Sequence, residues 1–219
     1  LPLVIDQLVR WGGADALEPL LAFVQRYRAD SVFAADVSPL VHAARDLFLE
    51  RGFDSVTVDE IAAVANVSRR TFFRYFATKE AAAFPNRDLW LEQSHGLTAH
   101  RSGEAAYQTV RRAILTMASA FMQNRDMMVA QHRIANGATS LIAYQRDVDR
   151  VWADVIADAL RAEHGSRESR LIGAAMMGGI RATLDEWFAQ GALGDLLDMG
   201  TMALELVERG VLHTAPKNG

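Results

Sequence analysis

The feature that most constrains this chain is a series of helix signals that begins at Thr57. Thr57 and Glu60 have the spacing of a capping box, in which the threonine hydroxyl accepts from the backbone amide of Glu60 and the glutamate accepts from the amide of Thr57. A helix is therefore predicted to begin at Thr57 and to run to Ala65. Asn66 tolerates the left-handed conformation of a sharp turn, and Ser68 is a favourable N-cap. The segment predicts two short helices joined by a three-residue turn.

The second of these helices has a local excess of positive charge. From Ser68 to Lys79 there are four basic side chains, no acidic one and four aromatic ones, namely Arg69, Arg70, Arg74, Lys79, Phe72, Phe73, Tyr75 and Phe76. A short turn followed by a basic helix is typical of a helix-turn-helix, whose second helix enters the major groove of DNA. Spacing alone leaves an ordinary helical hairpin open. Phe72 and Phe76 are expected in the core, because large aromatic side chains are usually buried.

The flanking segments predict further helices and an all-α fold. Ser38-Pro39 resembles an N-cap followed by proline at the first helical position, so a helix is expected from there to Gly52. The helix after Lys79 is expected to be short or kinked at Pro85. Helical periodicity then recurs near residues 104–124, 127–136, 138–164, 167–190 and 195–209, with breaks at Gly137, Gly165 and residues 191–194.

Composition excludes several classes of protein. The chain has 219 residues, half of them hydrophobic, and no cysteine, which excludes disulfides, thiolate nucleophiles and cysteine-bound metal sites. The longest apolar run, Leu171 to Ile180, is about half of the roughly 20 residues that a membrane span needs, so no membrane partner is expected. The first residues lack a signal-peptide pattern. The protein is expected in the cytoplasm.

Residues 40–84 closely resemble the DNA-binding domain of the TetR family of bacterial transcription regulators. The matching positions are Ala44, Leu47, Phe48, Gly52, Phe53, Thr57, Ile61, Ala62, Val67, Ser68, Thr71, Phe76 and Lys79. The resemblance implies a three-helix DNA-binding domain followed by a larger helical domain for ligand binding and dimerisation, about nine helices in all. The expected domains are a helical extension at 1–37, the helix-turn-helix domain at 38–84 and the second domain at 85–219.

The resemblance also implies roles in binding a double-stranded operator. Arg69, Arg70 and Thr71 would face base edges, and Tyr75 and Lys79 would contact phosphates. Arginine can bind guanine through two hydrogen bonds, and a threonine methyl can contact thymine. The full expected DNA-binding set is Thr57, Ser68, Arg69, Arg70, Thr71, Phe73, Tyr75 and Lys79.

All eight methionines follow residue 116, where the family places its ligand pocket and dimer interface. Methionine adapts to irregular shapes, and an apolar pocket is predicted from Trp90, Tyr107, Ile114, Met117, Phe121, Met128, His132, Tyr144, Trp152 and Met176. Periodic apolar positions on helices usually serve packing, so ordinary core is the alternative for each residue. The segment resembles family members that bind acyl-CoA-like ligands, including mycofactocin-cluster regulators. The expected effector is therefore acyl-CoA-like, with a neutral apolar molecule as the alternative.

The helix predicted near 167–190 is apolar on two faces, and one core cannot use both. One face, together with the last helix, is expected to form a homodimer interface through Ile172, Met176, Gly179, Thr183, Trp187, Leu197, Met202 and Leu206. The leading hypothesis is a dimeric, ligand-responsive regulator that represses transcription from a palindromic operator and has no cofactor, metal or catalytic residues. A ligand-binding or interaction protein of the same fold with little DNA affinity is the competing hypothesis. An enzyme ranks third, because no motif places a nucleophile beside a base.

Overall fold

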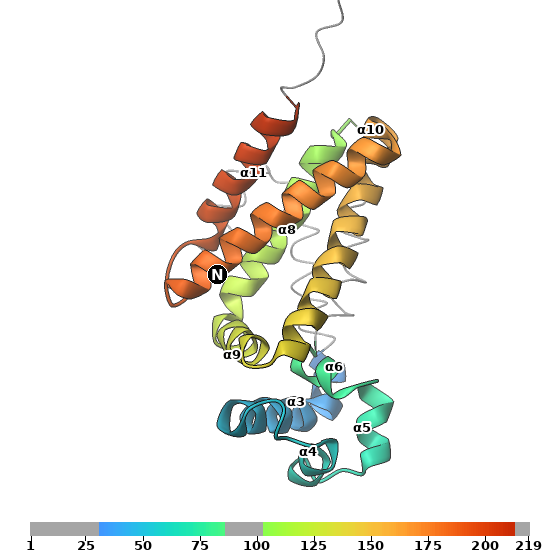
Figure 1. Cartoon of the computed structure of the whole chain (residues 1–219), viewed down its shortest axis with the longest axis vertical. Coiled ribbons are helices and arrows are strands. Elements are labelled where there is room, and N and C mark those ends of the chain that lie inside the picture. The colour runs from blue at the N-terminus through green and yellow to red at the C-terminus, as the bar shows by residue number, and fades with distance from the viewer. Residues whose placement is uncertain (1–30, 86–102, 213–219) are drawn as a thin grey trace, which may run out of the picture. The chain divides into compact units, whose positions relative to one another are not determined.

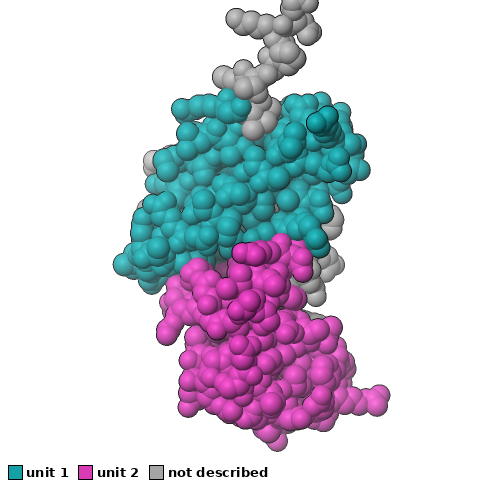
Figure 2. Space-filling view, in the orientation of Figure 1, with its two compact units in different colours: residues 1–13, 91–125, 149–219 teal, residues 14–90, 126–148 magenta. Residues whose placement is uncertain are grey.

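The computed structural model describes residues 31–85 and 103–212, and every regular element in these two ranges is an α-helix (Figure 1). The predicted all-α fold class is confirmed. The chain divides into two compact units (Figure 2). We call residues 14–90 and 126–148 the head unit, and residues 1–13, 91–125 and 149–219 the bundle unit. Most of the predicted N-terminal extension lies outside the described residues.

The head unit contains the predicted helix-turn-helix. Its helices are α3 (Ser31–Arg51), α4 (Val58–Val64), α5 (Arg69–Tyr75), α6 (Lys79–Ala83), most of α9 (Arg125–Asn136) and the beginning of α10 (Thr139–Ala189). The predicted short helix after Lys79 is confirmed, since α6 ends two residues before Pro85.

The core of the head unit is built from one face of each helix. On α3, Leu40, Ala44 and Phe48 are buried, at the helical spacing that the sequence predicts. The rings of Phe48 and Phe53 lie 5.0 Å apart at the point where α3 ends and the chain turns at Gly52. The same cluster includes side chains from α5, α6, α9 and α10: Phe72, Ala82, Ala83, Ile134 and Leu141.

The predicted helix start at Ser38-Pro39 is wrong. In the structure, α3 begins earlier, at Ser31, and Pro39 lies inside it. Proline has a fixed φ angle that suits a helix, so it can stand within one, although it has no N–H for the hydrogen bond to the preceding turn. The sequence Ser38-Pro39 looks like a helix start because it satisfies the first-turn preferences, but the residues before it are helical too.

The bundle unit is formed by α8 (Ala106–Gln123), the part of α10 after residue 148, and α11 (Leu196–Leu212). α8 and α11 pack against each other, and the Tyr107 hydroxyl on α8 donates to the carbonyl of Leu204 on α11 at 2.6 Å. Burial raises the pKa of Tyr107 to about 12, because the phenolate would be poorly solvated there. No described helix is both long enough and apolar enough to cross a membrane.

The predicted break at Gly165 is confirmed. Its φ of 68° and ψ of 168° interrupt α10, so that the helix consists of two arms, which Figure 1 shows folded against each other. The arms approach closely at Gly173, where a β-carbon would lie 2.6 Å from the carbonyl oxygen of Ala153. The Arg181 guanidinium on the second arm donates to both carboxylate oxygens of Asp149 on the first.

Candidate nucleic-acid interface

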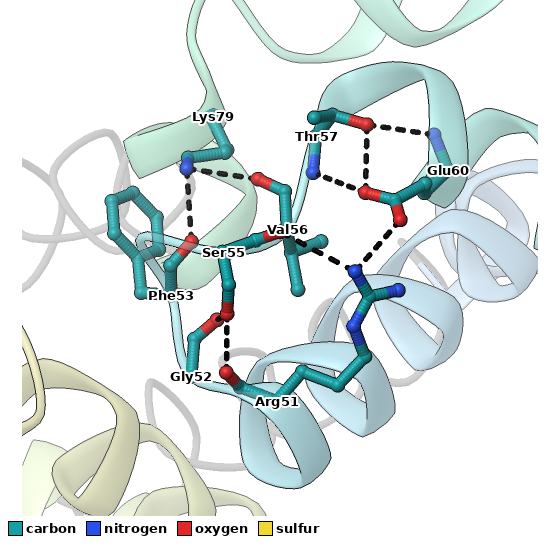
Figure 3. Close-up of polar contacts among 8 residues, drawn as sticks. All are labelled: Arg51, Gly52, Phe53, Ser55, Val56, Thr57, Glu60 and Lys79. Atoms are coloured by element: carbon teal, nitrogen blue, oxygen red, sulfur yellow. Dashed lines mark hydrogen bonds and ion pairs between the residues drawn. The ribbon is translucent and has the colours of Figure 1, made fainter.

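The predicted capping box at the start of α4 is present (Figure 3). The Thr57 hydroxyl accepts from the amide of Glu60 at 3.2 Å, and the Glu60 carboxylate accepts from the amide of Thr57 at 2.8 Å. Arg51 of α3 forms an ion pair with the other Glu60 oxygen at 2.8 Å. The hydrogen bonds from the Thr57 amide and hydroxyl, with that ion pair, lower the pKa of Glu60 from 4.5 to about 2. The beginning of α4 is therefore held by local contacts and tied to α3.

The turn between α4 and α5 has the predicted form. Asn66 adopts the left-handed conformation, with a φ of 54°. The amide of Val67 donates back to the carbonyl of Ala62 at 2.9 Å, which closes the end of α4. The Ser68 hydroxyl then accepts from the amide of Thr71 at 3.1 Å and caps α5. These contacts fix the direction in which α5 leaves the turn.

Helix α5 has one buried and one exposed face. Phe72 and Phe76 lie in the core of the head unit with their ring centroids 5.5 Å apart, as predicted. Arg69, Arg70 and Phe73 are exposed. The short helix is therefore anchored by two aromatic side chains, and its basic surface faces solvent.

The two neighbouring arginines at the start of α5 have different surroundings. The Nη1 atom of Arg69 lies 2.8 and 2.9 Å from the two carboxylate oxygens of Asp59 on α4. The guanidinium carbon of Arg69 lies 5.3 Å from the centre of the Phe73 ring, one helical turn further along α5. Arg70 makes neither an ion pair nor a hydrogen bond with other side chains in the described part of the chain. The contact of Asp59 with Arg69 was not predicted, because it depends on how α4 and α5 cross.

Lys79 and Tyr75, the expected phosphate contacts, are engaged within the head unit. The Lys79 ammonium donates to the carbonyls of Phe53 and Val56, each at 2.9 Å, and lies 4.1 Å from the centre of the Phe53 ring (Figure 3). The Tyr75 hydroxyl accepts from Arg74 at 2.9 Å. The first contact ties the start of α6 to the turn between α3 and α4. To bind a phosphate, the Lys79 ammonium would have to break one of these two hydrogen bonds or use its third N–H group.

The expected pocket residues are distributed over both units. In the bundle unit, Tyr107 and Met176 are buried in the core and Ile114 packs against it. In the head unit, the Tyr144 ring stacks on Phe84, with centroids 5.3 Å apart. Trp90 lies outside the described residues. The remaining predicted residues are partly or fully buried on their helices: Met117, Phe121 and Trp152 in the bundle unit, and Met128 and His132 in the head unit.

The residues of the expected dimer face lie in two different environments in the single chain. Ile172, Met176 and Trp187 on the second arm of α10 are fully buried within one chain, and Thr183 and Leu197 are also buried. These five side chains are packed inside their own bundle unit. The opposite face of the same arm is the exposed one, since Leu171 has 66% of its surface accessible. On α11, Met202 and Leu206 are 60% and 61% exposed, and Gly179 is partly buried beside Val207.

Comparison with known proteins gives matches both to the helix-turn-helix and to the whole fold. The family model described as "Bacterial regulatory proteins, tetR family" matches residues 40–81. A mycofactocin biosynthesis transcriptional regulator of Mycobacterium tuberculosis is 30% identical over 57% of this chain. The match spans 63% of that protein, which is less than two thirds of its length.

Two solved structures extend the match beyond the helix-turn-helix. FadR from Thermus thermophilus, a TetR-family repressor in complex with lauroyl-CoA, is 26% identical, with a TM-score of 0.56 over 83% of this chain and 98% of its own. FadR from Bacillus subtilis, in complex with stearoyl-CoA, is 18% identical, with a TM-score of 0.60 over 80% of this chain and 98% of its own. The second likeness shows the fold alone.

Proposed function

We propose that this chain, which belongs to the TetR family of transcriptional regulators, is a cytoplasmic, ligand-responsive repressor that binds a palindromic operator as a homodimer. Its relatives are regulators rather than enzymes. An acyl-CoA-like molecule would release the protein from DNA. The observation that supports the proposal most strongly is the arrangement of α4 and α5. The turn and the caps fix the direction of α5, which buries Phe72 and Phe76 and exposes its basic side chains.

The proposed DNA contacts follow from the exposed face of α5. Arg70 is exposed, and its guanidinium has no ion pair among the described residues, which suits two hydrogen bonds to guanine O6 and N7 in the major groove. Arg69 and Thr71 lie beside it at the start of the helix, and Phe73 offers an apolar contact to a thymine methyl or a sugar. Thr57 and Ser68 place the first turns of α4 and α5 where amide groups can face phosphates. Tyr75 and Lys79 remain proposed phosphate contacts, with Lys79 exchanging a carbonyl for a phosphate oxygen.

The proposed homodimer uses the exposed apolar face of the bundle unit. Leu171 on α10 and Met202 and Leu206 on α11 are large apolar side chains that stay in water in a single chain. Burying such side chains is favourable by about 1.5–3 kcal/mol each. A two-fold contact through these helices would place two copies of α5 to read two half-sites of a palindrome. Leu171→Glu and Met202→Glu should each shift the protein to monomers in sedimentation.

The proposed effector is acyl-CoA-like because of the bundle interior and the structural likeness. The lining that we propose for the acyl chain is partly buried and apolar or aromatic, with Met117 and Phe121 on α8 and Trp152 on α10. The Thermus thermophilus FadR, which matches most of this chain, holds lauroyl-CoA. A neutral apolar molecule is the alternative effector.

The proposed path of the signal runs through the head unit. Ala82 and Ala83 of α6 share a core with Ile134 of α9 and Leu141 of α10, and Phe84 stacks on Tyr144. The DNA-reading helices therefore belong to the same compact unit as α9 and the beginning of α10. A ligand that moves either helix would move α5 with it. It can shift the equilibrium only by its difference in affinity for the two states.

The direct test combines effector binding with DNA release. Lauroyl-CoA, free coenzyme A, laurate and a neutral hydrophobe are compared for their effect on the melting temperature and on binding to an operator obtained by selection from random duplexes. We expect lauroyl-CoA to raise the melting temperature and to dissociate the operator complex. Met117→Glu should weaken this response, and Gln123→Glu, which adds the same charge at the exposed end of α8, should not. A response to the neutral compound alone would favour the alternative effector.

A second candidate function is a ligand-binding protein of the same fold with little DNA affinity. Residues 38–84 contain six acidic and six basic side chains, so the domain has no net charge with which to attract DNA. One of the exposed arginines is also neutralised by Asp59. Failure to select any palindromic sequence at low salt, with ligand binding intact, would support this candidate over the repressor.

A further inference from the structure

An acidic side chain lies within the basic surface of the helix-turn-helix. Asp59, in the first turn of α4, forms the ion pair with Arg69 described above, and the two side chains are 65% and 60% exposed. The neighbouring acid, Glu60, is directed to Thr57 and Arg51 instead. Asp59 is therefore the acid of α4 that faces the DNA-reading helix.

The ion pair leaves part of Arg69 available for DNA. Both contacts to Asp59 are made by Nη1, while Nε and Nη2 keep their N–H groups. Two adjacent nitrogens of one guanidinium are enough for the two acceptors on guanine. The Phe73 ring supports the guanidinium from a second direction. Arg69 is thus oriented by two neighbours and still has a free edge.

The same ion pair makes phosphate contacts less favourable. An exposed ion pair exchanges easily with water, so it does not lock Arg69 in place. A phosphate approaching Arg69 would nevertheless meet the negative charge of Asp59 at the same nitrogen. Phosphate contacts supply most of the sequence-independent affinity for DNA, and base contacts supply the discrimination. A carboxylate at this position therefore penalises the first kind of contact more than the second.

We infer that Asp59 is a specificity-determining residue, which orients Arg69 toward a base edge without fixing it and lowers the affinity for sequences other than the operator. This inference rests on the proposed function, since it requires that α5 reads DNA. Asp59 acts through Arg69 and is a positioning residue. This role would also explain how a domain without net charge can prefer its operator over other DNA sequences, because Asp59 weakens nonspecific binding beside an arginine that reads a base.

The experiment measures the ratio of dissociation constants for a selected operator and a scrambled duplex of equal length and composition. For Asp59→Asn, we expect tighter binding to the scrambled duplex and a ratio that falls roughly fivefold, the lower end of what one base-reading arginine contributes. For the scrambled duplex, the plot of log binding constant against log salt concentration should become steeper by about one phosphate contact, because Arg69 no longer pairs with Asp59 and can bind a phosphate. Melting temperatures confirm that each variant is folded.

Two controls separate a local from a general charge effect. Asp54→Asn removes the same charge from another exposed position of the domain, and Asp54 forms no ion pair within the described residues. It should tighten binding to both duplexes alike and leave the ratio unchanged. In an Arg69→Ala background, Asp59→Asn should no longer change the ratio, since Asp59 has no guanidinium to orient.

The outcomes distinguish this inference from the proposed function. Suppose that the wild-type protein prefers the operator, but that Asp59→Asn has the same ratio of dissociation constants, or a ratio lowered only as much as in Asp54→Asn. The role of Asp59 is then contradicted, while the proposed function as a DNA-binding regulator stands. The role is likewise contradicted if Asp59→Asn acts equally in the Arg69→Ala background. If the wild-type protein binds both duplexes equally, DNA reading itself is overturned, and the inference with it.

Discussion

The three short helices of the head unit, α4, α5 and α6, begin at side-chain caps, whereas α8 in the bundle unit begins without one. Thr57, Ser68 and Thr78 each accept a hydrogen bond from an amide three residues ahead, at the starts of α4, α5 and α6. At the start of α8, Ala105 provides no such bond, and the amide of Ala106 donates instead to Glu163, 57 residues away. The starts of α4, α5 and α6 are therefore held by neighbours in the sequence, and the start of α8 by a partner brought near through folding.

This difference explains why the sequence predicts the helix-turn-helix better than it predicts the ligand pocket or the dimer face. The helices α4 and α5 are seven residues each, too short to be stable alone, so they must be held by their caps and by their buried side chains, Ile61 and Ala62 on α4 and Phe72 on α5. The long helices of the bundle unit depend on packing of their apolar faces. Many combinations of apolar residues can fill such a core. The helix-turn-helix is therefore recognisable from its sequence, while the pocket and the dimer face are not.

The largest effect is expected from removing the aromatic anchor of the short helices. Phe72→Ala should lower the free energy of unfolding of the head unit by about 3–5 kcal/mol, because the side chain is fully buried among other core residues. Phe73→Ala removes an equally large ring from the exposed side of the same helix, and its effect should be much smaller. Urea denaturation followed by circular dichroism measures both. Equal losses would show that α5 is not anchored by its buried face.

The bundle unit should be most sensitive at the close approach of the two arms of α10. Gly173→Ala places a β-carbon 2.6 Å from the carbonyl of Ala153 and should destabilise the unit by about 1–3 kcal/mol. Gly178→Ala, on the same helix with open space around it, should be stabilising by up to about 1 kcal/mol, because alanine favours a helix. The two melting temperatures should move in opposite directions. A harmless Gly173→Ala would mean that the arms are further apart than the structure shows.

A smaller effect is expected from the cap of α4. Thr57→Ala removes the acceptor for the Glu60 amide and should cost about 1 kcal/mol. Thr57→Ser keeps the hydroxyl and should retain most of the stability. If the serine variant is destabilised as much as the alanine variant, the methyl group rather than the cap accounts for the loss.

The smallest effect is a dependence of stability on pH that comes from Glu60. Its pKa is about 2 in the folded protein and ordinarily 4.5, so protons bind more strongly to the unfolded chain. The contribution of Glu60 is therefore complete above pH 4.5 and is lost as the pH falls from there toward 2. Glu60→Gln should remove this part of the pH dependence. Denaturation midpoints at neutral pH and within this window test it, and parallel curves for the two proteins would contradict it.

The features that the sequence predicted are those that depend on residues a few positions apart. The capping box at Thr57, the left-handed Asn66, the Ser68 cap and the break at Gly165 all belong to this class. The start of α3 was misjudged, because Pro39 fits the first turn of a helix as well as its interior.

The features that the sequence did not predict depend on which helix faces which. Both faces of the second arm of α10 are apolar, so only the folded bundle shows that Ile172 points into the core and Leu171 into solvent. The contacts of Lys79 with Phe53 and of Asp59 with Arg69 join residues 26 and 10 positions apart across a turn. No periodicity marks such pairs.

The central claim is that the exposed face of α5 reads DNA bases, and Arg70→Ala tests it most directly. Binding of the wild-type and variant proteins is measured against a selected operator in which every base pair is changed in turn. We expect a palindromic site, a loss of about 1–3 kcal/mol for the variant, and indifference to the base at one position in each half-site where the wild-type protein requires guanine. Equal weakening at all positions, or no palindrome for the wild-type protein, would contradict the claim.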